Sequence, residues 1–291
     1  MQSFVDFEVI ISDDASTDNS LKIAKKWQDQ DKRFKLFSHS ENVGMTQNWN
    51  QALNYATGKF IMKLDADDAY NPATLEHLVN AISAPDTGIA FCRTLECNDD
   101  LTIKNTYRGE QALISAAINP AHDVIKSAQE WYQLTLADAQ LWHSNAFIVP
   151  RELLISMDGW NDDFGCASDT DLIFRLLEQN HKVAHLSYLG VLYRMREGSI
   201  SDGFRQNDKL VDENYITSLK SVKRFHNAGK KLTYRAKLNW FRIYLNARNR
   251  VTKVENSALS SVVSDCKPPL SVMLLGTVQR YLYQLKMALA K

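Results

Sequence analysis

The sequence has little cysteine, no signal peptide and no long apolar run, and each absence excludes a class of protein. Its four cysteines among 291 residues form no CxxC pair, which argues against a disulfide framework or a zinc site and suits a reducing compartment. The N-terminus lacks the basic and apolar regions of a signal peptide. The most apolar stretch, Leu270 to Leu275 continuing to Tyr283, is interrupted by Gln279 and Arg280 and falls short of the roughly 20 residues that cross a bilayer. We therefore expect a cytoplasmic protein without a membrane span.

The sequence also has no net charge, because 34 Lys and Arg balance 34 Asp and Glu. Residues 1–205 carry 18 basic and 29 acidic side chains, whereas residues 206–291 carry 16 and 5. The hydrophobic content of 45% is ordinary for a globular protein and excludes disorder. The neutrality is thus a cancellation between an acidic region, 1–205, and a basic one, 206–291, which we expect to be separate domains.

Short apolar runs alternate with helical patterns over the first hundred residues, which is typical of βαβ units around a mostly parallel sheet. After residue 98 the pattern is mixed, and after Ser201 only long helical patterns remain. The sequence therefore predicts an α/β fold with a C-terminal helical appendix. The expected strands are 7–12, 34–37, 60–64, 88–92, 145–149, 183–187 and 191–195, and the expected helices are 21–30, 46–56, one opened by Pro72, 128–136 and 169–179.

Two acidic clusters follow predicted strands: Asp13 and Asp14 after the first, and residues 65–68 (DADD) after the third. In an open α/β sheet, ligands bind beyond the carboxyl ends of the strands. Crowded carboxylates repel one another unless a cation lies between them, and oxygen ligands favour Mg²⁺ or Mn²⁺ over zinc. Such an ion commonly bridges substrate phosphates, so the pattern suggests a nucleoside-diphosphate ligand. The alternative for either cluster alone is a solvated acidic turn.

Three ordered blocks resemble family 2 GT-A glycosyltransferases: residues 7–18 (FEVIISDDASTD), 41–50 (ENVGMTQNWN) and 57–68 (TGKFIMKLDADD). A fourth, GWNDDF from Gly159 followed by SDTDL from Ser168 and continuing to residues 199–201 (SIS), resembles the acceptor-side segment of that family. The resemblance covers residues 7 to 203. It implies a Rossmann-like nucleotide-diphospho-sugar transferase fold.

The resemblance also implies roles for individual residues. Asp14 corresponds to the residue that binds the nucleotide base, and Asn42 and Gly44 of the second block lie on the same nucleotide-sugar side. Asp65 and Asp67 form the DxD motif that contacts the ribose and the metal, with Asp68 as an additional candidate. Asp169 corresponds to the general base, which takes the proton from an acceptor hydroxyl as the oxygen attacks the anomeric carbon and inverts its configuration.

For Asp169 the position at a helix start favours an ionised carboxylate through the helix dipole; the alternative is a plain N-cap. Asp171 is expected to point elsewhere. Asp162 and Asp163 are weaker base candidates that shape the acceptor loop. The seven histidines show no nucleophile partner at a recognisable spacing and are assigned no chemistry.

The chain departs from the family pattern in four ways. Family members begin with a strand and a Pro-Thr-Tyr-Asn-like turn upstream of the first block, so we expect the sheet to lack its usual first strand. Trp49 stands where an arginine is frequent, Ser168 replaces a glutamate before the base, and Arg196 replaces a histidine that can bind metal. Arg196 cannot bind a cation, although it can pair with a phosphate. These changes bear on metal affinity and donor placement more than on the fold.

The helical region from residue 214 to 254 contains eleven Lys or Arg and no Asp or Glu. A basic amphipathic helix is typical of elements that bind an anionic membrane surface. The alternatives are a solvated face packed on the acidic domain and, third, nucleic-acid binding, for which no recognition motif is present. We expect no nucleic-acid partner.

The sequence as a whole predicts a metal-dependent inverting glycosyltransferase. It would use Mg²⁺ or Mn²⁺, a nucleotide-diphosphate sugar donor and a saccharide or lipid-linked saccharide acceptor, in bacterial surface polysaccharide synthesis on the inner face of the membrane. Because the expected first strand is absent, the alternative is a truncated, non-catalytic nucleotide-sugar-binding relic. A nucleotidyltransferase shares the sheet and acidic site but needs a Gly-rich basic loop near the N-terminus, which we do not find.

Overall fold

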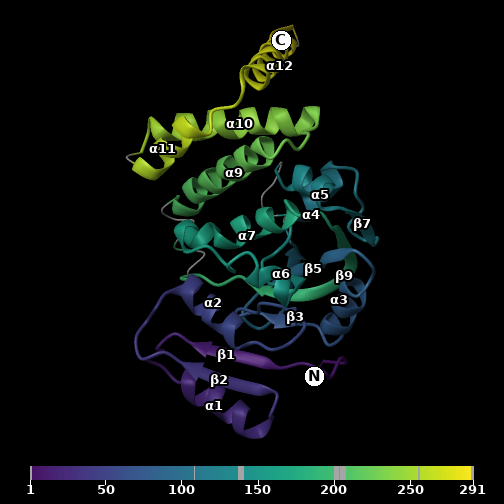
Figure 1. Cartoon of the computed structure of the whole chain (residues 1–291), viewed down its shortest axis with the longest axis vertical. Helices are drawn as coiled ribbons and strands as arrows, with labels where there is room; N and C mark the ends of the chain where they lie inside the picture. Colours follow the sequence, from purple (N-terminus) through teal and green to yellow (C-terminus); the bar gives the residue numbers. More distant parts are fainter. Residues whose placement is uncertain are drawn as a thin grey trace.

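The structure is a computed structural model that describes residues 2–107, 109–136, 141–199, 203, 208–254 and 256–289; for residues 281–289 only the backbone is described. The predicted domain boundary at residue 205, and Ile200 and Ser201 of the acceptor-side block, lie outside these residues. The first strands lie at one end of the molecule and the C-terminal helices at the other (Figure 1).

The chain begins with a β-α-β unit, as its sequence pattern predicts. Strands β1 (Val9–Asp13) and β2 (Phe34–Ser38) pair in parallel, with Val9 opposite Phe34. Helix α1 (Ser20–Gln30) connects them and α2 (Met45–Tyr55) follows. Within the described residues, β1 and β2 form a two-stranded sheet of their own, with no ladder to the larger sheet.

The larger sheet has the order β3-β8-β5-β9-β4, with β6 paired to β5 and β7 paired to β9. Only β5 and β9 run in parallel in it; the other described pairings are antiparallel. The prediction of a mostly parallel sheet is therefore wrong for this part, because β8 returns between β3 and β5 in the opposite direction. The strands are β3 (Phe60–Ile61), β4 (Ala69–Tyr70), β5 (Thr87–Cys97), β6 (Ile103–Thr106), β7 (Val124–Ser127), β8 (Phe147–Pro150) and β9 (Lys182–Arg194).

Several predicted bounds change because strands form only where a partner is present. Of the expected strand 60–64, only Phe60–Ile61 forms a strand, and these residues pair with β8. The two expected strands at 183–187 and 191–195 are one long strand, β9, which pairs with β5 through three register irregularities. In the mixed region 98–140 the predicted helix 128–136 is observed as Ala128–Thr135, and the described residues there also form two strands and one other helix that were not predicted. The helices of this half are α3 (Thr74–Ile82), α4 (Gly109–Ser115), α5 (Ala128–Thr135), α6 (Arg151–Ile155), the 3₁₀ helix η1 (Asp162–Ala167) and α7 (Ser168–Leu177).

The C-terminal region is helical, as expected, and packs against α5 and α7 (Figure 1). Its apolar side chains belong to the same buried cluster as those of the sheet half: Phe174 of α7, Phe225 and Trp240 are all in it. Tyr132 of α5 stacks on Phe225 with ring centroids 4.0 Å apart. No helix in the described part of the chain combines the length and apolarity needed to span a membrane. The helices are α9 (Lys209–Asn227), α10 (Tyr234–Val251), α11 (Ser257–Asp265) and α12 (Leu270–Leu289).

Candidate active site

The residues predicted for the nucleotide side lie together at the end of β1 and the start of α2. The Asp14 carboxylate accepts hydrogen bonds from the backbone N–H groups of Val43 (2.7 Å) and Gly44 (3.2 Å). The Asn42 side chain donates to the Asp14 backbone carbonyl (3.3 Å). Gly44 precedes α2 with φ of 90°, a conformation that glycine adopts without strain. Asp14, Asn42 and Gly44 thus form one unit, in which Asp14 holds the loop that begins α2.

The DxD turn follows β3 and places three carboxylates side by side. Asn145 donates through Nδ2 to Asp65 (3.2 Å) and to Asp68 (2.5 Å). The backbone N–H of Arg194 also donates to Asp68 (3.0 Å). Burial raises the pKa of Asp68 to about 6, although these two hydrogen bonds oppose the shift. The outer carboxylate, Asp67, forms an ion pair with Arg196 at 2.9 Å.

Lys63 connects the DxD turn to the predicted base. Its Nζ lies 2.9 Å and 3.0 Å from the two carboxylate oxygens of Asp65 and 3.5 Å from Oδ2 of Asp169. The Lys63 side chain is only 7% exposed. Its ammonium also lies 4.0 Å from the centroid of the Trp49 ring, a favourable cation–π geometry. Burial disfavours the ammonium, but the two carboxylates outweigh it and raise the pKa of Lys63.

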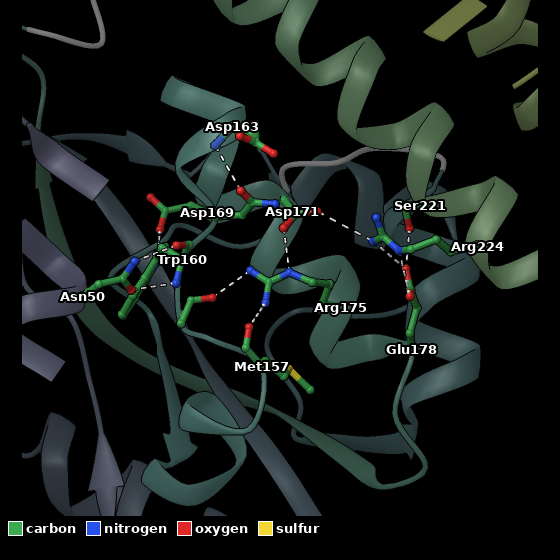
Figure 2. A network of polar contacts seen from close by, with 12 residues as sticks. Asn50, Met157, Trp160, Asp163, Asp169, Asp171, Arg175, Glu178, Ser221 and Arg224 are labelled. Carbon is green, nitrogen blue, oxygen red and sulfur yellow. Dashed lines mark hydrogen bonds and ion pairs between the residues drawn. The ribbon is translucent and has the colours of Figure 1, made fainter. Parts of the chain in front are cut away.

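Asp169 lies in the first turn of α7, with its carboxylate held by two other elements. Figure 2 shows the indole of Trp160 directed at Asp169, and Nε1 donates to Oδ1 at 2.8 Å. The N-cap of α7 is Ala167, so the reading of Asp169 as a plain N-cap is wrong. Burial raises the pKa of Asp169, and Lys63 opposes that shift. Among the contacts of this carboxylate, Lys63 contributes most to its ionised form; a contribution of the helix dipole stays a prediction.

The other acidic residues of the acceptor-side segment have different partners. Asp171 is fully buried and turns to Arg175, whose Nε lies 2.6 Å from Oδ2 (Figure 2). This orientation away from the Asp169 carboxylate is the one predicted. Asp162 accepts a hydrogen bond from Gln47 (3.0 Å), and the Asp163 backbone N–H binds the Asn161 side chain (3.0 Å).

A divalent cation suits the oxygen donors of the DxD turn. Within the described residues, no three His, Cys, Asp or Glu side chains converge on a common metal position. Mg²⁺, however, needs only one or two carboxylates when water and phosphates complete its shell. Asn145 Oδ1 is buried and lacks a hydrogen-bond partner among the described residues, so a further oxygen beside Asp65 and Asp68 is unsatisfied. The side chains that fit such an ion are Asp65 and Asp67, the latter once Arg196 releases it.

Sequence reasoning missed four residues of this site. Lys63 could have been found, because it precedes Asp65 by two residues at the end of a strand and alternation favours a shared face. Asn145 reaches Asp65 and Asp68 only through long-range packing, which leaves no local signal, whereas Trp160 stands nine residues before Asp169 in the acceptor-side block. His143, given no chemistry from the sequence, lies with Nδ1 4.0 Å from Asp68 Oδ2.

The basic residues of the C-terminal region divide into two groups. Arg224 pairs with Glu178 (2.9 Å), Arg250 with Asp212 (2.8 Å), and Lys230 donates to the Glu178 backbone carbonyl. Lys220 lies 4.8 Å from the Phe164 ring centroid. Of these, Arg224, Lys230 and Lys220 contact the acidic half, in agreement with the alternative of a basic face packed on it, whereas Arg250 pairs within the C-terminal region. Lys231, Arg235 and Arg248 are exposed.

Comparison with known proteins agrees with the fold. Residues 1–139 match the family described as "Glycosyl transferase family 2". The chain is 28% identical over 142 residues to the uncharacterized glycosyltransferase YibD of Escherichia coli (strain K12), which covers 49% of this chain and 39% of YibD. The chain therefore spans well under half of that relative.

Two solved structures share the architecture. TarS of S. aureus (residues 1–349), in complex with UDP-GlcNAc, superposes with a TM-score of 0.53 at 17% identity, covering 96% of this chain and 85% of that one. The mannosyltransferase PcManGT of Pyrobaculum calidifontis, in complex with GDP-Man and Mn²⁺, gives a TM-score of 0.50 at 18% identity, covering 95% and 75%. At these identities the likeness concerns the fold. Residues 1–139 thus match glycosyl transferase family 2, and the chain has the GT-A fold with additional C-terminal helices.

Proposed function

We propose that the chain is an inverting glycosyltransferase that moves a sugar from a nucleotide-diphosphate donor to a saccharide or lipid-linked saccharide acceptor. The family match supports a glycosyltransferase. The observation that carries the finer proposal is the position of Lys63, whose ammonium contacts both Asp65 of the DxD turn and Asp169. Asp65, which is predicted to bind the donor, and Asp169, which is predicted to activate the acceptor, therefore contact the same lysine.

On the donor side, the Asp14 unit and the DxD turn would hold the two parts of the nucleotide. The loop fixed by Asp14 is rigid because both carboxylate oxygens bind the backbone at the start of α2. Asp65 would contact the ribose and, with Asp67, would hold Mg²⁺ or Mn²⁺. Such an ion, when bound, would offset the charge that develops on the leaving diphosphate.

On the acceptor side, Asp169 would act as the general base. A base must be ionised before it takes a proton, and burial works against that. The ammonium of Lys63 favours the ionised form of the Asp169 carboxylate, and the hydrogen bond from the Trp160 indole N–H fixes the orientation of Oδ1. Oδ2 remains beside Lys63, so the proton of an acceptor hydroxyl would pass to a carboxylate of fixed orientation as the oxygen attacks the anomeric carbon.

Replacement of Asp169 by asparagine tests this assignment. We expect Asp169→Asn to abolish transfer and leave the affinity for nucleoside diphosphate nearly unchanged, as measured by product formation and calorimetry. Asp163→Asn, which alters an exposed acid of the neighbouring loop, is the matched control and should retain transfer. Undiminished transfer by Asp169→Asn would refute the base assignment. Nucleotide binding by the unaltered chain with no transfer to any saccharide would favour the non-catalytic alternative.

We further propose that exposed cations of the C-terminal region bring the site to an anionic membrane surface, where a lipid-linked acceptor for surface polysaccharide is available. Lys231 and Arg235 are exposed, and each cation near such a surface contributes about 1 kcal/mol. Co-sedimentation with phosphatidylglycerol vesicles should fall when Lys231, Arg235 and Arg248 are neutralised together. Lys230, bound to the Glu178 carbonyl, is expected to contribute little. Unchanged sedimentation of the triple variant would contradict the proposal.

A further inference from the structure

The helix that carries Asp169 begins without a cap of its own. The N-cap residue of α7 is Ala167, which makes no side-chain cap hydrogen bond. A helix start normally has a Ser, Thr, Asp or Asn that binds the free backbone N–H groups. In a capping box, a Glu in the first turn also accepts the N–H of the N-cap residue. Neither contact is provided by the residues of α7 itself.

Helix α9 of the C-terminal region supplies the second of these contacts. Glu213 Oε2 accepts hydrogen bonds from the backbone N–H of Ala167 (3.3 Å) and from the Cys166 thiol (2.7 Å). On the other side of Asp169, the Thr170 hydroxyl donates to Asn214 Oδ1 (3.3 Å). Adjacent residues of α9 therefore hold the positions before and after Asp169.

The turn before α7 is shaped to admit Glu213. Gly165 has φ of 46°, and a Cβ at this position would lie 2.9 Å from Glu213 Oε1. The positive φ favours glycine here, and the missing Cβ leaves room for the Glu213 carboxylate. The Glu213 side chain is 16% exposed, and Lys209 lies 3.7 Å from its carboxylate.

Further along α7, a second contact fixes its rotation. Arg224 of α9 reaches Glu178 at 2.9 Å and lies 3.6 Å from Asp171 (Figure 2). Ser221 also donates to Glu178 at 2.8 Å. Helix α9 therefore contacts α7 at both ends, and Glu213 is the α9 residue that binds the backbone at the start of α7.

We propose that Glu213 is a positioning residue for Asp169, so that the C-terminal helices form a working part of the acceptor-side site. This inference rests on the proposed role of Asp169 as the base. Loss of the Glu213 carboxylate frees the turn at Cys166 and Ala167, and the Asp169 carboxylate then moves relative to Lys63 and Trp160. A displacement of about 1 Å at a catalytic group can lower the rate of a reaction by about 100-fold.

The test compares Glu213→Ala with Asp212→Ala. Asp212 is the neighbouring carboxylate on α9 and is buried to a similar extent, but it pairs with Arg250 and Asn256, away from α7. We expect Glu213→Ala to lower kcat about 10- to 100-fold, with unchanged affinity for nucleoside diphosphate. Asp212→Ala should keep kcat within about twofold although it too loses a buried ion pair. Glu213→Gln, which keeps an oxygen acceptor, should recover part of the loss.

A second measurement follows the geometry without an acceptor substrate. The indole N–H of Trp160 donates to Asp169, so its ¹⁵N–¹H resonance, assigned with Trp160→Phe, reports on the carboxylate. We expect this resonance to shift in Glu213→Ala and to stay in place in Asp212→Ala.

The outcomes separate this inference from the proposed function. An unmoved Trp160 resonance, or full transfer by Glu213→Ala while Asp169→Asn is inactive, overturns the positioning role alone. Full transfer by Asp169→Asn overturns the base assignment and the positioning role together. Equal losses of kcat in Glu213→Ala and Asp212→Ala overturn it as well, because they would indicate general destabilisation.

Discussion

Replacing Lys63 by methionine should separate the charge of this residue from its volume. The substitution keeps an unbranched chain beside Trp49 but leaves Asp65 and Asp169 without their shared cation. At 3.5 Å and an effective dielectric of about 20, the lost attraction between Lys63 and Asp169 is about 5 kcal/mol before compensation. Removal of one partner of a buried pair costs about 3 to 5 kcal/mol in stability. Lys63→Met should therefore be destabilised by an amount of this order at pH 8.

The pH dependence of this variant gives the sharper test. Burial already raises the pKa of Asp169, and Lys63 opposes the shift, so removal of Lys63 must raise the pKa further. When the pKa of a carboxylate is higher in the folded state than in the unfolded state, the free energy of unfolding falls as pH increases from the unfolded-state pKa to the folded-state pKa. The destabilisation of Lys63→Met should accordingly be greatest at alkaline pH and should decrease as pH falls and Asp169 becomes protonated.

The stability of Lys63→Met should fall as pH increases, whereas its transfer activity should rise. Because only ionised Asp169 can act as a base, the acidic limb of the kcat profile should move to higher pH in Lys63→Met, and activity should recover as pH increases. Urea unfolding and initial rates between pH 5 and 9 measure both effects. Lys59→Met, which alters the lysine just before β3 whose ammonium lies over the Phe60 ring, is the control, and Lys63→Arg should restore part of the activity. An acidic limb that stays in place in Lys63→Met would refute the role assigned to this ammonium.

Two further predictions concern the metal and the β1 edge. Arg196→Ala releases Asp67 from its ion pair and should tighten Mn²⁺ binding about two- to fivefold, the range expected for an exposed pair; weaker binding in a calorimetric titration would contradict this. Burial opposes ionisation of Glu8, but Lys35 and the N–H groups of Thr57 and Gly58 lower its pKa from 4.5 to about 2. The ionised Glu8 carboxylate therefore stabilises the fold fully above pH 4.5, and this stabilisation is lost as pH falls toward 2. Glu8→Gln should thus lower the free energy of unfolding by about 1 to 3 kcal/mol at pH 7, with a smaller loss at pH 3, and an equal loss at both pH values would count against the assignment.

Much of the local structure follows from the sequence because it depends on neighbouring residues. The predicted helix 21–30 is observed as Ser20–Gln30, and the predicted strand 34–37 as Phe34–Ser38. Both are set by apolar spacing and by a clear stop signal, which require no distant partner. The long strand β9 was predicted as two pieces, because its continuity depends on pairing with β5, a feature of the sheet and not of the segment.

In the candidate site, too, some features follow from neighbouring residues and others depend on distant ones. Asp14, Asn42 and Gly44 could be grouped from their motif blocks, and the structure brings them together through the backbone of α2. The ionisation of Asp169 could not be judged from its position at a helix start, because the first turn of α7 is buried. Its state depends on Lys63, which comes from another element.

The sequence by itself thus determined the order of most elements in the sheet half, the helical character of the C-terminal region and the identity of the acidic turns at the strand ends. The tertiary structure alone decided that the sheet is mixed, that Lys63 joins the two carboxylate groups and that Glu213 of α9 caps the helix of Asp169. The physical reason is the distance along the chain over which each effect acts. Periodicity and turn chemistry act over a few residues, whereas burial and the pairing of charges depend on which distant segments share a core.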